Sequence, residues 1–295
     1  MVVMCRWRAL STVMVLAAGA ALSGCSTAAG DGETRVVAGI YPYAYLAQRI
    51  GGPHVDVVDL TAPGVEPHGL ELTPQQTAEV VGADVVVYAH GFQPAVDDAV
   101  AQSPADHIVD VSDVVSLAGP PDAPDPHVWL DPAKLVPVVR AISDQLSAAT
   151  RRHTAAFRAN AAAVVRQLQT LDRDFRAGLA QCERAVFVTS HAAFGYLARR
   201  YGLRMVAVAG TDPHAEPSPQ RQAELVDLIR SSGVTTIFTE HLASPAIAAS
   251  LAKETGTSVA TLDPIEALPT ETSNATYFSL MRANLDALRR ANGCR

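Results

Sequence analysis

Three histidines and one aspartate in this 295-residue chain each follow a short apolar segment that predicts a β-strand. His68 and His127 lie in the loops after the second and fourth such segments, in "VEPHGL" and "DPHVWLDP". His191 ends "VFVTSH" and Asp263 ends "SVATLD". Ligands of open α/β sheets bind beyond the carboxyl ends of the strands. Three imidazoles and one carboxylate, which are donors that bind divalent cations, are therefore expected to converge in one cleft.

Position after a strand does not by itself select these residues. His90, His214 and His241 also follow predicted strands, and a lone histidine there is more often a structural hydrogen-bonding group than a ligand. His191 has one further feature, because it stands at the expected start of a helix over 191–201. The positive partial charge of a helix N-terminus disfavours imidazolium, and only neutral imidazole binds a cation.

The octapeptide "DPHVWLDP" predicts several roles for its residues. His127 is the candidate ligand, and Trp129 is expected to be a packing residue. Asp131 and Pro132 have the types preferred at the N-cap and first position of the helix that follows.

Alternating strands and helices predict an α/β fold of two lobes, each with a mainly parallel sheet flanked by helices. Helix starts are indicated by Thr73 and Ser244, and each is followed by proline. Segment 147–180 lacks proline and has one late glycine, so it predicts a single backbone helix of roughly 45 to 50 Å. Strands are expected at 36–40, 55–60, 84–89, 107–111, 185–190, 204–210, 234–240 and 258–263, and a closing helix at 273–292.

The N-terminal segment predicts export and a lipid anchor. Two arginines precede an apolar stretch that is too short for a membrane span, and "LSGC" resembles a bacterial lipobox ending at Cys25. A buried N-terminal helix is the alternative, but no amphipathic period interrupts the apolar run. The expected boundaries are a signal peptide (1–24), a tether (25–35), an N-terminal lobe (36–146), a linking helix (147–181) and a C-terminal lobe (182–295).

The charge of the chain is acidic. Its net charge is −7, and without Arg6 and Arg8 the mature part has 21 basic and 30 acidic residues, a net charge of −9. This balance argues against nucleic acid as a partner and against a polybasic membrane patch. A cation is the more natural partner.

Four cysteines are present, of which Cys5 would leave with the signal and Cys25 would carry lipid. In an oxidising compartment the remaining Cys182 and Cys294 suggest one disulfide. It would stabilise the fold by about 4 to 5 kcal/mol in the chain-entropy model. Two separate buried thiols are the alternative.

Several motifs together resemble one family across nearly the whole mature chain. They are "VEPHGLELTPQQTAEVVGADVVVYAHG", "DPHVWLDP", "VTSHAAFGYLARRYGL", "AEPSPQ" and "TLDP". Their order and spacing resemble the cluster A-I solute-binding lipoproteins of bacterial zinc and manganese ABC importers. The resemblance implies two lobes bridged by a rigid helix, with one metal between them held by His68, His127, His191 and Asp263.

The resemblance also bears on the choice of metal. Manganese-selective members tend to have glutamate at the position of His191, and three imidazoles with one carboxylate suit Zn²⁺ at four-coordination. Zinc is therefore expected, with Mn²⁺ as the alternative. The segment before His127 has no histidine-rich loop, unlike that of many zinc members. His90 replaces a common asparagine and is a candidate for an auxiliary contact.

The resemblance implies a protein that is anchored by lipid outside the membrane, acts as a monomer and delivers its cation to the permease and ATPase of an ABC importer. No enzymatic activity is expected. A zinc hydrolase with Glu66 or Glu240 as general base is one alternative, but the chain lacks an HExxH segment and four protein ligands would close the metal shell. An adhesin on the same fold is the other.

Overall fold

The computed structural model describes residues 33–120, 124–211, 213, 215, 217–242, 244–269 and 274–295. The expected signal peptide, Cys25 and His214 lie outside these residues. Residues 33–295 form one compact unit. Among the described residues, no helix is both long and apolar enough to cross a membrane.

The N-terminal lobe is a parallel sheet in the order β2-β1-β3-β4. Alternate residues of its strands enter two different cores. Val36 and Val85 pack with α1, α5 and α6, whereas Val37 and Val86 pack with α2 and α3. The elements are β1 (Thr34–Ala38), α1 (Tyr41–Gly51), β2 (Val55–Asp59), α2 (Pro74–Val81), β3 (Val85–Tyr88), α3 (Pro94–Ala101), β4 (Ile108–Asp110), α4 (Val111–Val114), α5 (Leu135–Ala149) and α6 (Thr154–Gly178).

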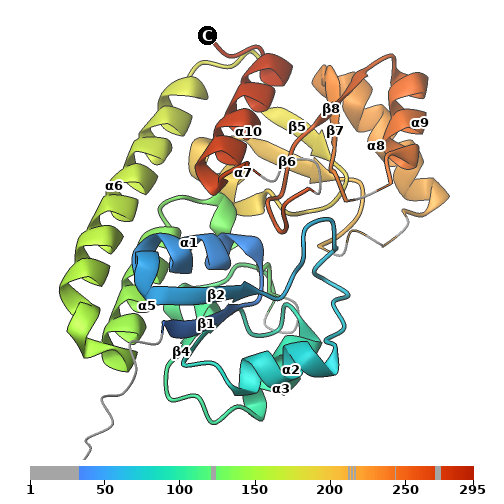
Figure 1. Cartoon of the computed structure of the whole chain (residues 1–295). Helices are drawn as coiled ribbons and strands as arrows, with labels where there is room; N and C mark the ends of the chain where they lie inside the picture. The colour runs from blue at the N-terminus through green and yellow to red at the C-terminus, as the bar shows by residue number, and fades with distance from the viewer. Residues whose placement is uncertain are drawn as a thin grey trace, which may run out of the picture. The chain divides into compact units, whose positions relative to one another are not determined.

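The C-terminal lobe repeats this plan with a parallel sheet in the order β6-β5-β7-β8 (Figure 1). Phe187 and Phe238 face the core shared with α6, and Val188 and Ile237 face α8 and α9. The elements are β5 (Val186–Thr189), α7 (Gly195–Tyr201), β6 (Arg204–Ala207), α8 (Pro219–Ser232), β7 (Thr236–Thr239), α9 (Ala246–Thr255), β8 (Ser258–Thr261) and α10 (Tyr277–Asn292). The predicted fold class and all eight expected strands are confirmed.

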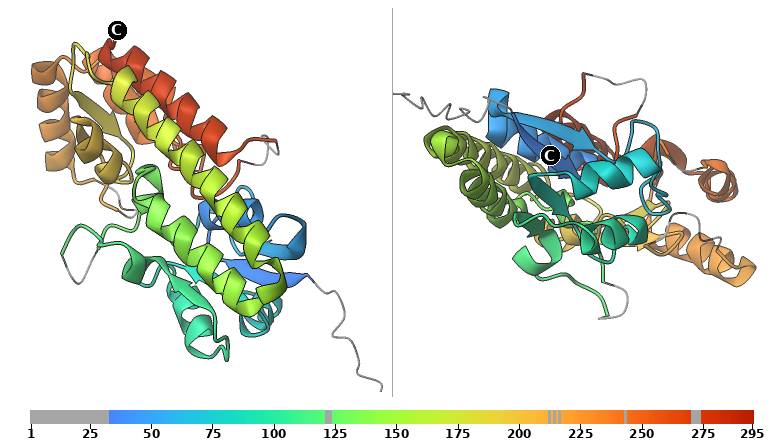
Figure 2. Two further views of the ribbon diagram at one scale, coloured as in Figure 1. Left: turned by 90° about the vertical axis from the view of Figure 1, so that its left-hand side faces the viewer. Right: turned by 60° about the horizontal axis from the view of Figure 1, so that its bottom comes forward.

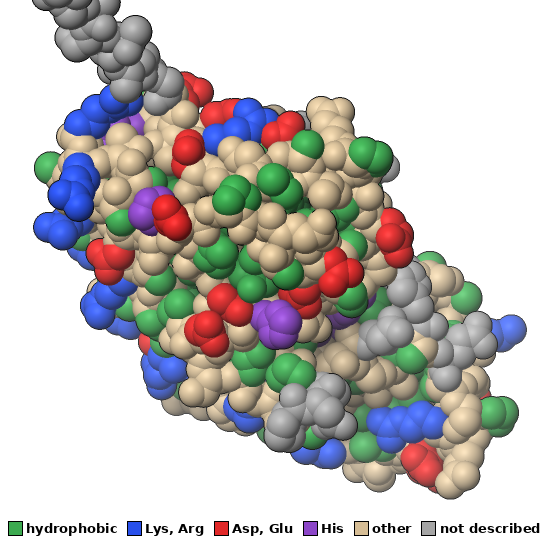
Figure 3. Space-filling model, turned by 90° about the horizontal axis from the view of Figure 1, so that it is seen from below, with side chains coloured by type: hydrophobic (Ala, Val, Ile, Leu, Met, Phe, Trp, Pro, Cys, Tyr) green, Lys and Arg blue, Asp and Glu red, His purple; other side chains and the backbone are tan. Residues whose placement is uncertain are grey.

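The helical bridge differs from the single helix expected over 147–180. Thr150 leaves the helical conformation, with φ −137° and ψ 80°, and its hydroxyl hydrogen-bonds to that of Thr34 at 2.6 Å. A short 3-10 turn (Arg151–His153) follows, so the bridge is the 25-residue α6, about 37 Å long. Helices α5 and α6 lie side by side (Figure 2), and basic side chains gather along the left edge of the molecule in Figure 3.

Some of the predicted helix ends are confirmed, and others are wrong. Thr73 forms the expected capping box with Gln76, and Gly293 ends α10 at φ 66°. Ser244 does accept a hydrogen bond from the N–H of Ala246, but α9 begins one residue later than predicted. The expectation that Asp131 caps the next helix is wrong, because α5 begins at Leu135 and Asp131 closes a turn before it. Apart from the helix ends, the C-terminal lobe contains a disulfide between Cys182 and Cys294, as expected.

Candidate metal centre

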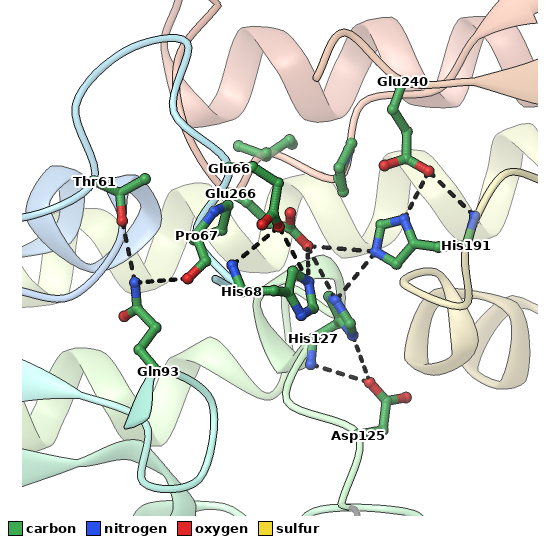
Figure 4. A network of polar contacts seen from close by, with 12 residues as sticks. Thr61, Glu66, Pro67, His68, Gln93, Asp125, His127, His191, Glu240 and Glu266 are labelled. Atoms are coloured by element: carbon green, nitrogen blue, oxygen red, sulfur yellow. Dashed lines mark hydrogen bonds and ion pairs between the residues drawn. The ribbon is translucent and has the colours of Figure 1, made fainter. Parts of the chain in front are cut away.

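Four side chains from four separate segments meet between the two sheets: His68, His127, His191 and Glu266 (Figure 4). One ligand atom from each lies within 4.8 Å of the other three. Glu266 Oε1 is 3.4 Å from His68 Nε2, 3.0 Å from His127 Nε2 and 3.5 Å from His191 Nε2. The Nε2 atoms of His127 and His191 are 3.4 Å apart. The predicted convergence of the three imidazoles is therefore present.

His127 is fully buried and is oriented by Asp125 of the same octapeptide. Asp125 Oδ1 accepts a hydrogen bond from His127 Nδ1 at 2.8 Å and another from the backbone N–H of His127 at 3.1 Å. The short turn Val128–Leu130 then carries the chain away. Because Nδ1 is bound to a carboxylate, Nε2 is the nitrogen presented to the centre.

His191 is held in the same way from the other lobe, by Glu240 after β7. Glu240 Oε1 is 2.7 Å from His191 Nδ1, and both side chains are almost fully buried. Burial alone would lower the pKa of His191, but hydrogen bonds to Glu240 and Glu266 outweigh it and raise this pKa to about 10. The prediction that a helix N-terminus keeps the His191 imidazole neutral is therefore wrong. Helix α7 begins only at Gly195, and nearby carboxylates favour the imidazolium.

His68 lies on the loop between β2 and α2, and its side chain is 13% exposed. Glu66 Oε1 accepts the backbone N–H of His68 at 3.0 Å. Gln93 reaches from the N-terminus of α3 to the carbonyl of Pro67 at 3.4 Å and to the hydroxyl of Thr61 at 3.2 Å. These bonds hold the loop, rather than the imidazole ring, in place.

Glu266 is the site residue that the sequence interpretation missed. Burial would raise its pKa, but hydrogen bonds to His127, His191 and His68 hold the pKa well below its usual value. The preceding Ile265 has φ 60°, in the left-handed region that a β-branched residue seldom adopts. This turn directs Glu266 into the centre, and the backbone N–H of Tyr41 binds its carbonyl at 3.3 Å.

Asp263, the predicted fourth ligand, is not part of the group of four. Its Oδ1 accepts the backbone N–H of Ile265 at 2.8 Å. Asn284 on α10 holds the backbone of Asp263 through bonds of 2.8 and 2.6 Å. Burial raises the pKa of Asp263 to about 6. The available signal for Glu266 was its position as the second carboxylate of the loop "LDPIEAL".

The other candidates lie apart from the centre. The side chain of His90 is 66% exposed, and its Nδ1 is 3.5 Å from Asp97 Oδ1, so the structure does not bring it to the four ligands. His241 is exposed on the loop after β7. Glu240 contacts His191 at Nδ1, away from the centre, whereas Glu66 Oε1 bonds the backbone N–H of His68 and also lies 3.9 Å from His68 Nε2.

Trp129 ties two of the ligand-bearing segments together. Its side chain is fully buried, which confirms its predicted packing role, and its Nε1 donates to the carbonyl of Pro264 at 2.7 Å. The hydroxyl of Tyr277 donates to the carbonyl of Trp129 at 2.6 Å. The positions of His127 and Glu266 are therefore coupled through one indole.

A cavity of about 400 Å³ adjoins the centre. Three carboxylates line it, those of Glu66, Glu240 and Glu266, together with Ser190 and mainly apolar side chains of the C-terminal lobe. Of the four ligand residues, Glu266 lines this cavity, so we expect a cation to approach the buried centre past that carboxylate.

The sequence of this chain is similar to those of bacterial zinc-binding and zinc-uptake proteins. The family model described as "ZnuA: Zinc-uptake complex component A periplasmic" matches residues 36–291. The zinc-binding lipoprotein AdcA of Streptococcus pneumoniae is 35% identical over 279 residues, which cover 88% of this chain and 56% of AdcA. The high-affinity zinc uptake system protein ZnuA of Bacillus subtilis is 29% identical, with 96% of this chain and 97% of that protein covered. The chain thus spans about half the length of the AdcA relatives.

Solved structures share the overall fold of this chain. The Zn(II)-bound ZnuA-like domain of Streptococcus pneumoniae AdcA superposes with a TM-score of 0.78 at 34% identity, covering 88% of this chain and 99% of that one. The laminin-binding protein Lmb of Streptococcus agalactiae, described as a bifunctional protein with adhesin and metal transporting activity, gives 0.82 at 30% identity, with 88% and 99% covered.

Proposed function

Because this chain belongs to the ZnuA family of zinc-uptake components, we propose that it captures Zn²⁺ outside the cytoplasm and delivers it to the permease of an ABC importer. The family binds and takes up metal and is not a family of enzymes, so the hydrolase alternative is set aside. The proposed ligands are His68, His127, His191 and Glu266, the last in place of Asp263.

The spacing of the ligand atoms carries this proposal. A regular tetrahedron of ligands at zinc bond lengths of about 2.0 to 2.1 Å has edges of about 3.3 to 3.4 Å. Four of the six distances among these ligand atoms range from 3.0 to 3.5 Å, and the two between His68 and the other histidines lie within 4.8 Å. Three imidazoles with a single carboxylate suit Zn²⁺, whereas Mn²⁺ favours oxygen-rich shells.

Two carboxylates prepare the imidazoles for the ion. Asp125 and Glu240 accept the Nδ1 protons of His127 and His191, which fixes the ring orientation and increases the basicity of Nε2. Zinc displaces the second proton of the raised-pKa His191, and the ionised Glu266 compensates part of the cation's charge.

The ligands come from both lobes, so a displacement of one segment breaks the shell and releases the ion. His68 and His127 follow β2 and β4, and His191 and Glu266 follow β5 and β8. Residues of α6 belong to a core that includes both sheets, which limits hinge motion between the lobes.

The cellular role extends this proposal. The lipobox-like "LSGC" supports a lipid anchor at Cys25, and the similar AdcA is named a lipoprotein. We infer a monomeric, membrane-tethered protein whose partners are the permease and ATPase of an importer. Zinc uptake by cells that carry Cys25→Ala would fall if the anchor is needed for delivery.

A paired substitution tests the ligand set. Purified wild type, Glu266→Gln and Asp263→Asn are compared by elemental analysis and by competitive titration with Zn²⁺ and Mn²⁺. We expect one zinc per chain and a loss of more than about 100-fold in zinc affinity for Glu266→Gln, beyond the 10- to 100-fold typical of losing a group that supports a ligand. Asp263→Asn keeps the acceptor for Ile265 and should retain the affinity.

The titration has clear contrary results. If Asp263→Asn loses zinc and Glu266→Gln keeps it, the fourth ligand is Asp263. Tighter binding of Mn²⁺ than of Zn²⁺ by wild type would overturn the zinc assignment.

A further inference from the structure

Helices α5 and α6 carry a basic face on an otherwise acidic protein. Residues 135–178 contain seven arginines and three aspartates, whereas the whole chain has 30 acidic and 23 basic residues. All seven arginines are exposed. They are Arg140, Arg151, Arg152, Arg158, Arg166, Arg173 and Arg176. From the net negative charge of the chain no basic patch was expected, so this local excess of arginines was not predicted.

A groove of about 300 Å³ lies between the two helices within this face. Arg140 of α5 and Arg158 of α6 stand at its sides, and the residues between them are Ser143, Ala161, Ala162 and Val165. Ser143 is a buried residue, 4% exposed, and the two alanines leave space beside it.

The two guanidinium groups of this groove have no partner among the described residues. In the part of the chain that the structure describes, neither Arg140 nor Arg158 takes part in an ion pair or a hydrogen bond. Other arginines of the protein are paired: Arg176 with Asp172 on α6, and Arg200 with Asp172 at 2.7 Å. Two free cations that face one groove from different helices are arranged to bind an anion between them.

The chemistry of the groove fits a phosphate group. Guanidinium groups match phosphate oxygens with paired N–H donors and are less strongly hydrated than ammonium groups. The Ser143 hydroxyl can add a donor, and Val165 with the alanines offers an apolar wall for the carbon atoms of a phosphodiester. This combination is the headgroup region of an anionic phospholipid.

The position of the groove favours a membrane as the source of that phosphate. Thr150, between α5 and α6, bonds Thr34 at the start of β1, so the described chain begins at the same end of the helix pair. Arg140 and Arg158 lie ten and eight residues from Thr150, within about 15 Å along the helices. Thr34 lies nine positions after Cys25, a span of about 30 Å at most.

We propose that the groove between Arg140 and Arg158 binds the phosphate of an anionic phospholipid headgroup and lays the α5–α6 face against the membrane surface. This proposal rests on the lipid anchor proposed above. The anchor supplies nearness to the membrane, and the basic face supplies an orientation of the protein on it.

Vesicle flotation tests this proposal. Residues 33–295 form a compact unit that holds the described elements and the disulfide, so this unit is used with zinc bound. It is mixed with vesicles of phosphatidylcholine alone or with phosphatidylglycerol. Each basic residue near an anionic surface contributes a factor of about five to partitioning. Arg140→Gln with Arg158→Gln should therefore lower binding to phosphatidylglycerol vesicles about 25-fold.

A matched control removes two positive charges elsewhere. Arg230→Gln with Lys253→Gln changes exposed residues of α8 and α9, on the opposite side of the unit from α6 (Figure 1). This control should change binding no more than about twofold, since it lies far from the surface. Zinc stoichiometry and affinity, measured on the same samples, should be equal in all three proteins.

Three results would overturn the proposal. Wild type could fail to float with phosphatidylglycerol vesicles, or the control could lose as much binding as the double variant. Inorganic phosphate could bind through Arg140 and Arg158 without any vesicle binding, which would assign the groove to a soluble anion. Failure of wild type to bind zinc would instead contradict the proposed function, independently of the vesicle result.

Discussion

Zinc affinity should keep rising with pH above the range in which an ordinary histidine titrates. In the zinc-free protein, burial acts to lower the pKa of His191, but Glu240 and Glu266 raise it to about 10. Asp125 and Glu266 likewise overcome burial and raise the pKa of His127. Only the neutral ring binds zinc, so the ion has to displace these protons.

The size of the effect follows from the pKa of His191. A pH of 7 is about three units below the pKa of His191. Protonation of this ring therefore reduces zinc affinity about 1000-fold, or on the order of 4 kcal/mol. Affinity should rise about tenfold per pH unit, and so about 100-fold between about pH 7 and about pH 9, from this residue alone. With an ordinary pKa near 6.5, the affinity would level off above about pH 7.5.

The assay is a competitive titration against a chelator from about pH 6 to about pH 10. Calorimetry in two buffers that differ in ionisation enthalpy counts the protons released near pH 8, and at least one is expected per zinc. Glu240→Gln removes the charge that favours the imidazolium, so its affinity should level off at a lower pH. Glu224→Gln, the same change on the exposed surface of α8, should leave the profile unchanged.

An affinity that is flat above about pH 7.5, with no proton released, would refute this account of the centre. The thermal stability of the zinc-free protein should depend on pH in the opposite direction to zinc affinity. A raised pKa means that the stabilisation from the His191 imidazolium is fully present below about pH 6.5 and is lost as pH rises through about 10. The Tm of the zinc-free protein should therefore fall over the interval in which zinc affinity rises.

Three further predictions concern the surroundings of the centre. Trp129→Phe leaves the Pro264 carbonyl unpaired and a void beside it, so thermal or urea denaturation should show a loss of about 2 to 4 kcal/mol, with weaker zinc binding. Cys182→Ser with Cys294→Ser should cost about 2 to 5 kcal/mol of stability without changing zinc affinity, since the pair lies outside the centre. Glu66→Gln should slow zinc association a few-fold at low ionic strength in stopped-flow measurements, because Glu66 contributes charge to the acidic cavity; an unchanged rate would count against this route.

The fold could be predicted from the sequence because its determinants are local. Short β-branched runs alternate with helical segments, and in parallel sheets covered on both faces such runs are almost wholly apolar. Thr73 and Gly293 mark helix ends through their own backbone and side-chain preferences. The break at Thr150 escaped prediction because it depends on a contact with Thr34, more than 100 residues away.

The three histidines were also accessible from the sequence, since each follows a strand within a distinct motif. The fourth ligand was not, because the choice between Asp263 and Glu266 is made by the left-handed turn at Ile265. No local preference places an isoleucine there, so the surrounding structure has to impose it. The pKa of His191 escaped for the same reason, since Glu240 is 49 residues away in the chain.

The way each ligand is held suggests which one moves during release. His127 and His191 have their Nδ1 atoms bound to buried carboxylates, and Trp129 locks the segments of His127 and Glu266 to each other. The loop of His68 is held through backbone hydrogen bonds, Glu66 Oε1 lies 3.9 Å from His68 Nε2, and His68 is the most exposed of the four ligands. Because α6 resists hinge motion, we expect the β2–α2 loop to open first and carry His68 away from the ion, which leaves three ligands and an open coordination position.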